Sequence, residues 1–226
     1  MNQPPKKIVL FANGDLPASE RILAQLSPED LLIAVDGGLQ HLTHHNLTPN
    51  LIIGDLDSAD PNDVKKFRDQ GMEVHQYPPE KDETDLELAL DAAIELQPDC
   101  IWILGALGKR IDQTLANIFL LARGHYSGND LRLIDGHQEI FLIRDFGQIE
   151  GVPGERVSLL PLNGAVHGIR TQGLLYPLQG ETLFPDRTRG ISNELTETVA
   201  QVTLESGLLL CIHAFNVTHP KGGLNE

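Results

Sequence analysis

Two acidic motifs carry residue types that can bind a divalent cation. In residues 51–58 (LIIGDLDS), three β-favouring residues lead into Gly54, and the carboxylates of Asp55 and Asp57 follow with one residue between them. This pattern predicts a buried strand that ends at a tight turn, with both acids at its carboxyl end. Together with Ser58 they form a hard oxygen-donor set of the kind that Mg²⁺ selects when it also binds phosphates. A solvated turn stays open as the alternative, because Asp and Gly are frequent in turns.

The second acidic motif, residues 80–87 (EKDETDLE), has a partly structural explanation. Thr84 and the glutamate three residues later fit a capping box at a helix start, and Asp85 in the first turn complements the helix dipole. Neither rule requires Lys81 or Asp82. These two residues are therefore candidates for a chemical role.

Glycine loops with charged or polar residues follow four of the predicted strands. In a parallel sheet such loops emerge at one edge, where ligands bind, so residues far apart in sequence converge there. Glycines in these loops would let backbone amides approach phosphate oxygens closely. Neither a dinucleotide-binding motif nor a P-loop is present, and a purely structural loop stays open for residues 105–110. The four loops are residues 13–15, 36–38, 54–58 and 105–110, and the glycines concerned are Gly37, Gly38, Gly105 and Gly108.

Arg110 and Asp112 lie at a predicted helix start. Asp112 is expected to cap a helix over residues 113–123, which Gly124 ends. Arg110 could bind a phosphate through two parallel hydrogen bonds, as guanidinium geometry allows. For Asp112 the residues alone leave the cap and a role in ligand binding equally open.

The first part of the chain alternates between apolar strand-like runs and helix patterns. This alternation is typical of an α/β fold in which a parallel sheet is covered on both faces, a three-layer arrangement. Helices are expected at residues 17–26, 39–45, 61–70, 84–96 and 113–123, and strands at 8–12, 31–35, 51–53, around 74, 100–104 and 131–134.

After Asp135 the pattern changes to short β-rich runs separated by Gly, Pro and Asn. This change predicts an antiparallel β-sandwich as a C-terminal domain, with the boundary near Gly136. The domains are then residues 1–136 and 137–226, and residues 219–226 are expected to be disordered. The β-rich runs are residues 140–143, 157–160, 169–171, 199–204 and 208–212.

A net charge of −15 limits the partners of this 226-residue chain. Nucleic acid and anionic membrane are not expected as main partners, because both would repel it. A nucleotide would need a divalent cation to approach the acidic motifs, whereas a cationic organic substrate would be attracted. The start has no apolar signal region, and no apolar run approaches the ~20 residues of a membrane span. Cys100 and Cys211 are isolated in apolar runs, so buried free thiols and a cytoplasmic location are expected.

The ordered set of motifs resembles the thiamine pyrophosphokinase family over nearly the whole chain. The resemblance implies an N-terminal α/β domain that binds ATP and Mg²⁺, a C-terminal β-sandwich domain for thiamine binding and dimerisation, and a homodimer with active sites between subunits. It also implies transfer of a diphosphoryl group from ATP to the thiamine hydroxyl, with release of AMP. The motifs are residues 36–38 (DGG), 54–58 (GDLDS), 81–87 (KDETDLE), 105–113 (GALGKRIDQ) and 190–194 (GISNE).

The resemblance assigns roles residue by residue. The acids that match the Mg²⁺ ligands are Asp55, Asp57 and Asp85, with Asp82 and Thr84 in the same acidic site. The positions that match parts of the nucleotide site are Asp36, Gly105, Gly108, Lys109, Arg110 and Asp112. Ser192 and Asn193 match a short motif near the thiamine pyrimidine. Two departures are Lys109, where bacterial relatives often have a second glycine, and Gln113, where many have histidine.

The expected reaction is an in-line attack of the thiamine hydroxyl on the β-phosphorus of ATP. Positioning and charge neutralisation dominate such transfers. Lys81, Lys109 and Arg110 are candidates to neutralise phosphate charge, and Asp82 could accept the hydroxyl proton. Asp57→Ala is expected to abolish transfer and to leave the fold intact.

Two other functions remain open at this stage. A metal-dependent phosphohydrolase or nucleotidyltransferase would use the same acids, but it leaves Ser192, Asn193 and the sandwich domain without a role. A catalytically silent regulator that binds nucleotide or thiamine has little need for so many carboxylates. AMP formation only in the presence of thiamine would distinguish the diphosphate transfer from a phosphohydrolase or nucleotidyltransferase. Binding of ligands without turnover would favour the regulator.

Overall fold

The computed structural model describes residues 6–108 and 110–215. By its internal contacts the chain divides into two compact units, Met1–Gly136 and His137–Glu226, and each is described by itself. The expected disorder of residues 219–226 and the roles predicted for Lys109 fall outside the described residues. Within that part of the chain, every helix is too short or too polar to cross a bilayer.

The first unit contains a six-stranded parallel sheet in the order β6-β5-β1-β2-β3-β4. Continuous apolar runs form its central strands because both faces of these strands are buried. The strand order reverses between β1 and β5, which is the type of position where open α/β sheets bind ligands. The strands are β1 (Lys7–Phe11), β2 (Leu31–Val35), β3 (Leu51–Gly54), β4 (Glu73–Gln76), β5 (Cys100–Leu104) and β6 (Asp130–Ile134).

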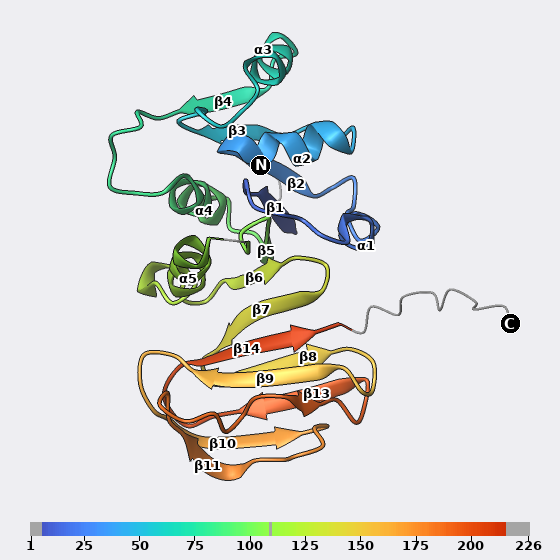
Figure 1. The fold of residues 1–226 in the computed structure, drawn as a ribbon, viewed down its shortest axis with the longest axis vertical. Coiled ribbons are helices and arrows are strands. Elements are labelled where there is room, and N and C mark those ends of the chain that lie inside the picture. The colour runs from blue at the N-terminus through green and yellow to red at the C-terminus, as the bar shows by residue number, and fades with distance from the viewer. Residues whose placement is uncertain (1–5, 109, 216–226) are drawn as a thin grey trace, which may run out of the picture. The chain divides into compact units, whose positions relative to one another are not determined.

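Helices lie on both sides of this sheet, with α4 and α5 on one side and α1 on the other (Figure 1). The α/β class predicted for this part of the chain is therefore correct. Asp60 and Thr84 cap α3 and α4, since their side chains accept hydrogen bonds from the backbone amides of Asn62 and Glu87. The helical segments are α1 (Ser19–Leu23), the 3₁₀ turn η1 (Asp36–Gly38), α2 (Leu39–His44), α3 (Pro61–Asp69), α4 (Asp85–Glu95), α5 (Ile111–Leu120) and η2 (Gly124–Tyr126).

The predicted start of the fifth helix is wrong. The helix α5 begins at Ile111, so Asp112 lies in its first turn and caps nothing. Arg110 is at the N-cap position, and the Asp112 carboxylate is paired with its guanidinium, Oδ2 to Nη2 at 2.5 Å. The helix also ends earlier than expected, at Leu120, and Gly124 begins η2.

The second unit is an antiparallel β-sandwich, as the sequence predicts. One sheet has the order β12-β9-β14-β7 and the other β11-β10-β13-β8, and apolar side chains from both sheets form a common core. The strands β8 and β11 were not predicted because their sequences are largely polar, and β12 was not predicted because two residues are too few to show a pattern. The strands are β7 (Gln138–Ile143), β8 (Phe146–Glu150), β9 (Arg156–Pro161), β10 (Val166–Gln172), β11 (Gln179–Leu183), β12 (Asn193–Glu194), β13 (Val199–Thr203) and β14 (Leu209–Ala214).

Candidate active site

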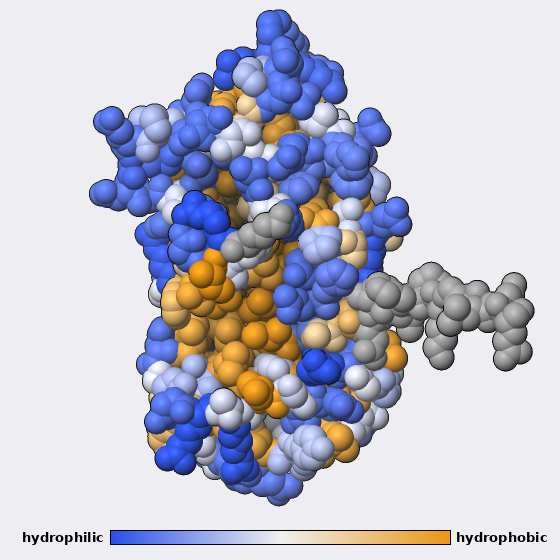
Figure 2. All heavy atoms as spheres, viewed as in Figure 1, coloured by the Kyte–Doolittle hydropathy of each residue, from blue (hydrophilic) through white to orange (hydrophobic). Residues whose placement is uncertain are grey.

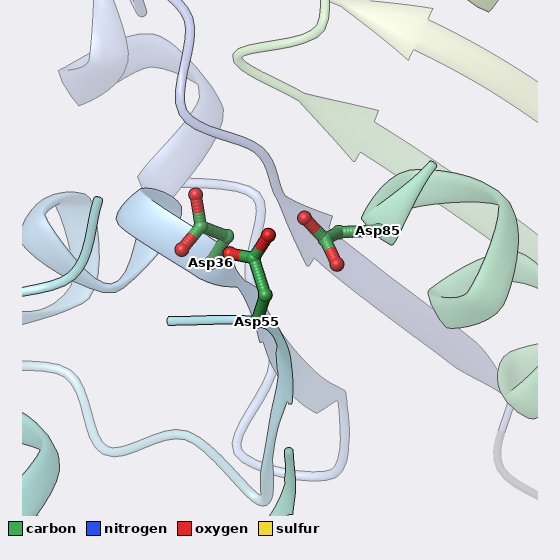
Figure 3. Close-up of side chains that lie close together, drawn as sticks. All are labelled: Asp36, Asp55 and Asp85. Carbon is green, nitrogen blue, oxygen red and sulfur yellow. The ribbon is translucent and has the colours of Figure 1, made fainter. Parts of the chain in front are cut away.

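Three carboxylates from separate elements converge at the carboxyl edge of the parallel sheet. Asp36 begins η1 after β2, Asp55 follows β3, and Asp85 begins α4. One oxygen of each lies within 4.8 Å of one oxygen of each of the other two, and the three side chains lie close together (Figure 3). We call Asp36, Asp55 and Asp85 the acidic cluster. It is a set of hard oxygen donors converging on one point.

The register of the sheet brings Asp36 beside Asp55. Val35 of β2 pairs with Ile53 of β3, so the residues that follow the two strands are neighbours. Gly54 has no side chain, and a Cβ atom there would lie 3.0 Å from the Asp36 Cβ. Asp36 itself is buried and has a φ of 49°, a left-handed conformation that costs energy for a residue other than glycine. Strain at this position therefore accompanies the convergence of the acids.

Backbone amides of the loop after β3 orient two members of the acidic cluster. The Asp57 amide donates to Asp55 Oδ1 at 3.2 Å, and the Ser58 amide donates to Asp36 Oδ1 at 3.3 Å. The Asp57 side chain is exposed and accepts a hydrogen bond from the Ser58 hydroxyl at 2.9 Å. Asp57 therefore supports the cluster through its backbone, and its carboxylate lies outside the cluster in this structure.

Lys81 provides positive charge within the cluster. Its Nζ atom lies 3.0 Å from Asp85 Oδ1 and 3.7 Å from Asp55 Oδ2. The pKa of Lys81 is raised: burial lowers it, but the close contact with the negatively charged Asp85 and the charge of Asp55 outweigh that effect. The pKa of Asp85 is also raised, chiefly by burial and further by the charges of Asp55 and Asp36, while Lys81 acts in the opposite direction.

Helix α4 positions Asp85, and local sequence explains where that helix starts. Thr84 Oγ1 accepts a hydrogen bond from the Glu87 amide at 3.2 Å. The reciprocal half of the predicted capping box is absent, because the Glu87 carboxylate pairs with Arg123 instead. Asp82 is exposed and lies outside the acidic cluster. The predicted motif therefore contributes Asp85 to the acidic cluster, Lys81 as a positive charge beside it, and Thr84 as the helix cap.

The loop after β5 is packed closely against the loop after β1. The Gly14 amide donates to Gly105 O at 2.7 Å, and a Cβ atom on Gly105 would lie 2.4 Å from Ala12 O. Gly105 also has a φ of 65°, so close approach and backbone conformation both require glycine there. This packing is sufficient to explain Gly105 without a ligand.

Other parts of the loop after β5 are more open. The Gly108 amide donates to Thr114 Oγ1 at 3.2 Å, so in this structure it already has an acceptor. Arg110, Asp112 and Gln113 are exposed. The charge and hydrogen bond of Arg110 hold the pKa of Asp112 below its usual value. These three side chains are accessible to a ligand.

Gly37 and Gly38 are buried in η1 and have close neighbours. A Cβ atom on Gly38 would lie 1.8 Å from Phe11 O, and one on Gly37 would lie 2.4 Å from the Asn13 side chain. Packing against the β1 backbone therefore demands glycine at position 38, whereas at position 37 the Asn13 side chain would have to move. Their predicted contact with phosphates stays a prediction.

In the second unit, Asn193 uses its side chain to hold a neighbouring loop. Its Oδ1 accepts from the Tyr176 amide at 3.0 Å and its Nδ2 donates to Tyr176 O at 2.8 Å. Ser192 is exposed and has a φ of 57°. The buried Asn193 thus fixes Tyr176, a residue that is 66% exposed. Sequence reasoning named Asn193 but missed this pairing with the Tyr176 backbone.

The donor set of the acidic cluster fits Mg²⁺. All three side chains offer carboxylate oxygens, the ligand type that this hard cation prefers. Asp85 Oδ1 is shielded from water, and Lys81 is at ion-pair distance from it without the geometry of a hydrogen bond. An additional cation would satisfy this oxygen. Sequence reasoning had placed Asp36 in the nucleotide site, although its position directly after a strand was the same signal that identified Asp55.

Comparison with known families agrees with the two units. Residues 23–133 match a family described as the catalytic domain of thiamin pyrophosphokinase. Residues 146–209 match one described as the vitamin B1 binding domain of thiamin pyrophosphokinase. The first match includes the acidic cluster, and the second includes Tyr176, Ser192 and Asn193.

Individual proteins resemble the chain over nearly its whole length. A thiamine pyrophosphokinase of Bacillus subtilis is 32% identical over 212 residues, which span 92% of this chain and 99% of that protein. A crystal structure of the B. subtilis enzyme has a TM-score of 0.85, with 31% identity and coverage of 94% of this chain and 100% of that one. The structure from Geobacillus thermodenitrificans has a TM-score of 0.80 at 25% identity, covering 94% and 99%. The chain belongs to the thiamine pyrophosphokinase family.

Proposed function

We propose that this chain is a Mg²⁺-dependent enzyme that transfers the diphosphate group of ATP to the hydroxyl of thiamine and releases AMP. The observation that carries the proposal is the convergence of Asp36, Asp55 and Asp85 at the edge of a parallel sheet. The family membership supports the transfer reaction. A net charge of −15 agrees with a need for a cation when the polyanionic donor approaches.

The acidic cluster would hold Mg²⁺, which, when bound, neutralises phosphate charge. Asp36, Asp55 and Asp85 supply the oxygens. The Asp57 carboxylate, predicted as a ligand, is two residues away on the exposed side of the same loop. We propose that the Asp57 carboxylate joins the metal site when the substrates bind.

The remaining residues of the first unit bind and orient the donor. Arg110 has an exposed guanidinium that can pair with phosphate oxygens in place of Asp112. Asp82, exposed beside the cluster, is proposed to accept the proton of the thiamine hydroxyl on its carboxylate. The residues proposed to contact the nucleotide are Asp36, Gly37, Gly38, Lys81, Thr84, Gly105, Gly108, Lys109, Arg110, Asp112 and Gln113.

Thiamine is proposed to bind the second unit near Ser192 and Asn193. The match of residues 146–209 to a vitamin B1 binding domain supports this role. Asn193 would act by holding the Tyr176 loop, because its own amide group is already hydrogen-bonded there. The exposed ring of Tyr176 offers a π-face to the cationic substrate.

A homodimer in the cytoplasm completes the proposal. Apolar side chains reach the molecular surface (Figure 2), and Ile111, Leu115 and Phe119 of α5 are 68%, 45% and 53% exposed. These residues recur every four positions, so they form one apolar stripe that an interface between two copies could cover. Cys211 is buried as predicted, whereas Cys100 is half-buried, and within the described residues neither forms a disulfide, which agrees with a reducing compartment. Light scattering of the purified chain tests the dimer.

The deciding experiment incubates the purified chain with ATP, Mg²⁺ and thiamine, and quantifies AMP and thiamine diphosphate. Equal amounts of both products are expected, and neither product when thiamine or Mg²⁺ is omitted. AMP formed without thiamine would indicate a phosphohydrolase. Binding of ATP and thiamine without products would indicate a regulator.

A further inference from the structure

The Lys81 ammonium lies among carboxylates rather than in water. Its Nζ atom is 3.0 Å from Asp85 Oδ1 and 3.7 Å from Asp55 Oδ2, and 11% of the side chain is exposed. An ammonium group is strongly hydrated and usually stays in solvent. Its burial here is therefore explained by the negative charge of the acidic cluster.

The carboxylates that Lys81 contacts, those of Asp55 and Asp85, are also proposed to hold Mg²⁺. Asp36, Asp55 and Asp85 each offer one oxygen within 4.8 Å of the others. Two cations that share these carboxylates repel each other, and at partly buried side chains the repulsion is stronger than in bulk water. The ammonium and a divalent cation therefore cannot both keep these contacts.

Lys81 is attached in a way that lets its charge move. The residue belongs to the connection between β4 and α4, and its backbone amide is held by Pro79 O at 3.2 Å. Its Nζ atom also donates to Pro78 O at 3.2 Å. Four rotatable side-chain bonds allow the ammonium to change partners while the backbone stays fixed. Asp85, in contrast, is fixed in the first turn of a capped helix.

We propose that Lys81 is a displaceable internal counter-ion. In the free enzyme it pairs with Asp55 and Asp85 and keeps the mutually repelling carboxylates assembled. When Mg²⁺ and the nucleotide bind, Lys81 leaves these carboxylates and binds the phosphate oxygens, so one lysine serves two states of the site. The inference rests on the proposed function for the identity of the anion, a nucleotide polyphosphate, while the competition with the cation is independent of transfer to thiamine.

The proposal predicts opposite effects of Lys81→Met on two ligands. Isothermal titration with Mg²⁺ alone should show binding about tenfold tighter than in the wild type, because the competing charge is gone. Titration with ATP in saturating Mg²⁺, without thiamine, should show binding about tenfold weaker, because a charged phosphate contact is lost. Tighter metal binding together with weaker nucleotide binding is the expected result.

Two control variants separate charge from general effects. Lys81→Arg keeps the positive charge and should leave the affinity for Mg²⁺ alone close to the wild type. Lys65→Met removes an exposed lysine that pairs with Asp69 on α3, and should change neither titration. Unchanged or weaker binding of Mg²⁺ alone by Lys81→Met, or a shift of both ligands in the same direction, would overturn the proposal.

A measurement on the wild type covers the case in which Lys81→Met does not fold. In NMR spectra of ¹⁵N-lysine protein, the Lys81 ammonium should exchange slowly with water in metal-free buffer, and faster once Mg²⁺ alone is added. An ammonium signal that Mg²⁺ leaves unchanged would also overturn the proposal. Loss of thiamine-dependent AMP formation with these Mg²⁺ effects intact would count against the proposed function and leave the counter-ion in place.

Discussion

The two units of this protein each concentrate carboxylates, and they stabilise them in different ways. In the second unit, His213 is fully buried between two glutamates, with Nδ1 3.1 Å from Glu139 Oε1 and Nε2 3.0 Å from Glu155 Oε2. In the first unit, Asp36, Asp55 and Asp85 face one another, with Lys81 beside two of them.

The difference lies in how the polar atoms are satisfied. Glu139 is the cross-strand neighbour of His213, and Glu155 also accepts a hydrogen bond from the Val152 amide at 2.8 Å. These contacts are made by sheet neighbours and a tight turn, so they are fixed by the fold. In the acidic cluster, Asp36 is in a strained conformation and Asp85 Oδ1 is shielded from water without a hydrogen bond. A strained backbone and a buried oxygen without a hydrogen bond are typical of a ligand-binding site. Buried polar groups whose hydrogen bonds are all made are typical of a structural element.

The largest effect that this comparison predicts is on catalysis by the acidic cluster. Asp55→Asn should lower AMP formation by about 1000-fold, because it weakens the proposed hold on Mg²⁺ at the point where phosphate charge must be neutralised. In buffer with a metal chelator, the midpoint of thermal unfolding of this variant should not fall, because the substitution removes one of three mutually repelling negative charges. Parallel assays of AMP and thermal unfolding check both parts. A variant that loses stability and keeps its activity when folded would place Asp55 with the structural carboxylates.

The buried histidine cluster should respond in the opposite way. Glu155→Ala leaves the Val152 amide and one side of His213 without this partner in the interior, which should lower the free energy of unfolding by about 3 kcal/mol. Urea denaturation measures the loss, and Glu197→Ala, at an exposed glutamate of the same unit, is the matched control. A loss no larger than that of the control would mean that the cluster contributes little to the fold.

Asp57→Ala tests how far the functional carboxylates extend beyond the acidic cluster. If the exposed carboxylate joins the metal site when substrates bind, transfer should fall by about 100-fold with unchanged stability. The backbone hydrogen bond from residue 57 to Asp55 does not need the side chain, so the cluster itself should persist. Near-normal AMP formation in this variant would refute the assignment of Asp57 as a ligand.

A smaller effect is expected at the anchor of the helix that carries Asp85. The Tyr126 hydroxyl donates to Asp91 of α4 at 2.9 Å, and the Tyr126 ring is buried. Tyr126→Phe should therefore cost about 1 kcal/mol of unfolding free energy. Tyr176→Phe, at a largely exposed ring, should cost nothing measurable by the same urea titration. Equal effects at the two positions would contradict a structural role for the Asp91 hydrogen bond.

The smallest effect is on the pH dependence of stability in metal-free buffer. The pKa of Asp85 is raised by burial and by Asp55 and Asp36, so the folded state holds this proton more tightly than the unfolded chain. Its contribution to stability is full below the unfolded pKa and is lost as pH rises through the folded pKa. The stability of Asp85→Asn relative to the wild type should therefore increase as pH rises above the usual aspartate pKa of about 3.9. Urea titrations at several pH values measure the difference in unfolding free energy between Asp85→Asn and the wild type. A difference that does not change with pH would contradict the raised pKa of Asp85.

Local pattern was sufficient for most of the elements and for part of the site. Apolar runs are long enough to specify buried strands, and Asp60 and Thr84 cap helices because the cap depends on residues three or fewer positions away. The same reasoning found Asp55, which follows a strongly patterned strand. It explained Asp85 by the helix dipole, and only the family resemblance assigned Asp85 to the metal ligands. Strands β8, β11 and β12 escaped it because their stability comes from neighbouring strands rather than from their own apolar pattern.

The sequence alone predicts that acidic residues lie at one edge of a parallel sheet, because the loops that follow parallel strands all emerge at that edge. Tertiary structure decided which acids meet. The pairing of Val35 with Ile53 sets Asp36 beside Asp55, and the position of α4 brings Asp85 and Lys81 to them. The hydrogen bond between the Asn193 side chain and the Tyr176 backbone and the ion pair between Arg110 and Asp112 are also visible only in the folded chain. The physical reason is that register and loop packing depend on contacts between distant residues, which no local pattern contains.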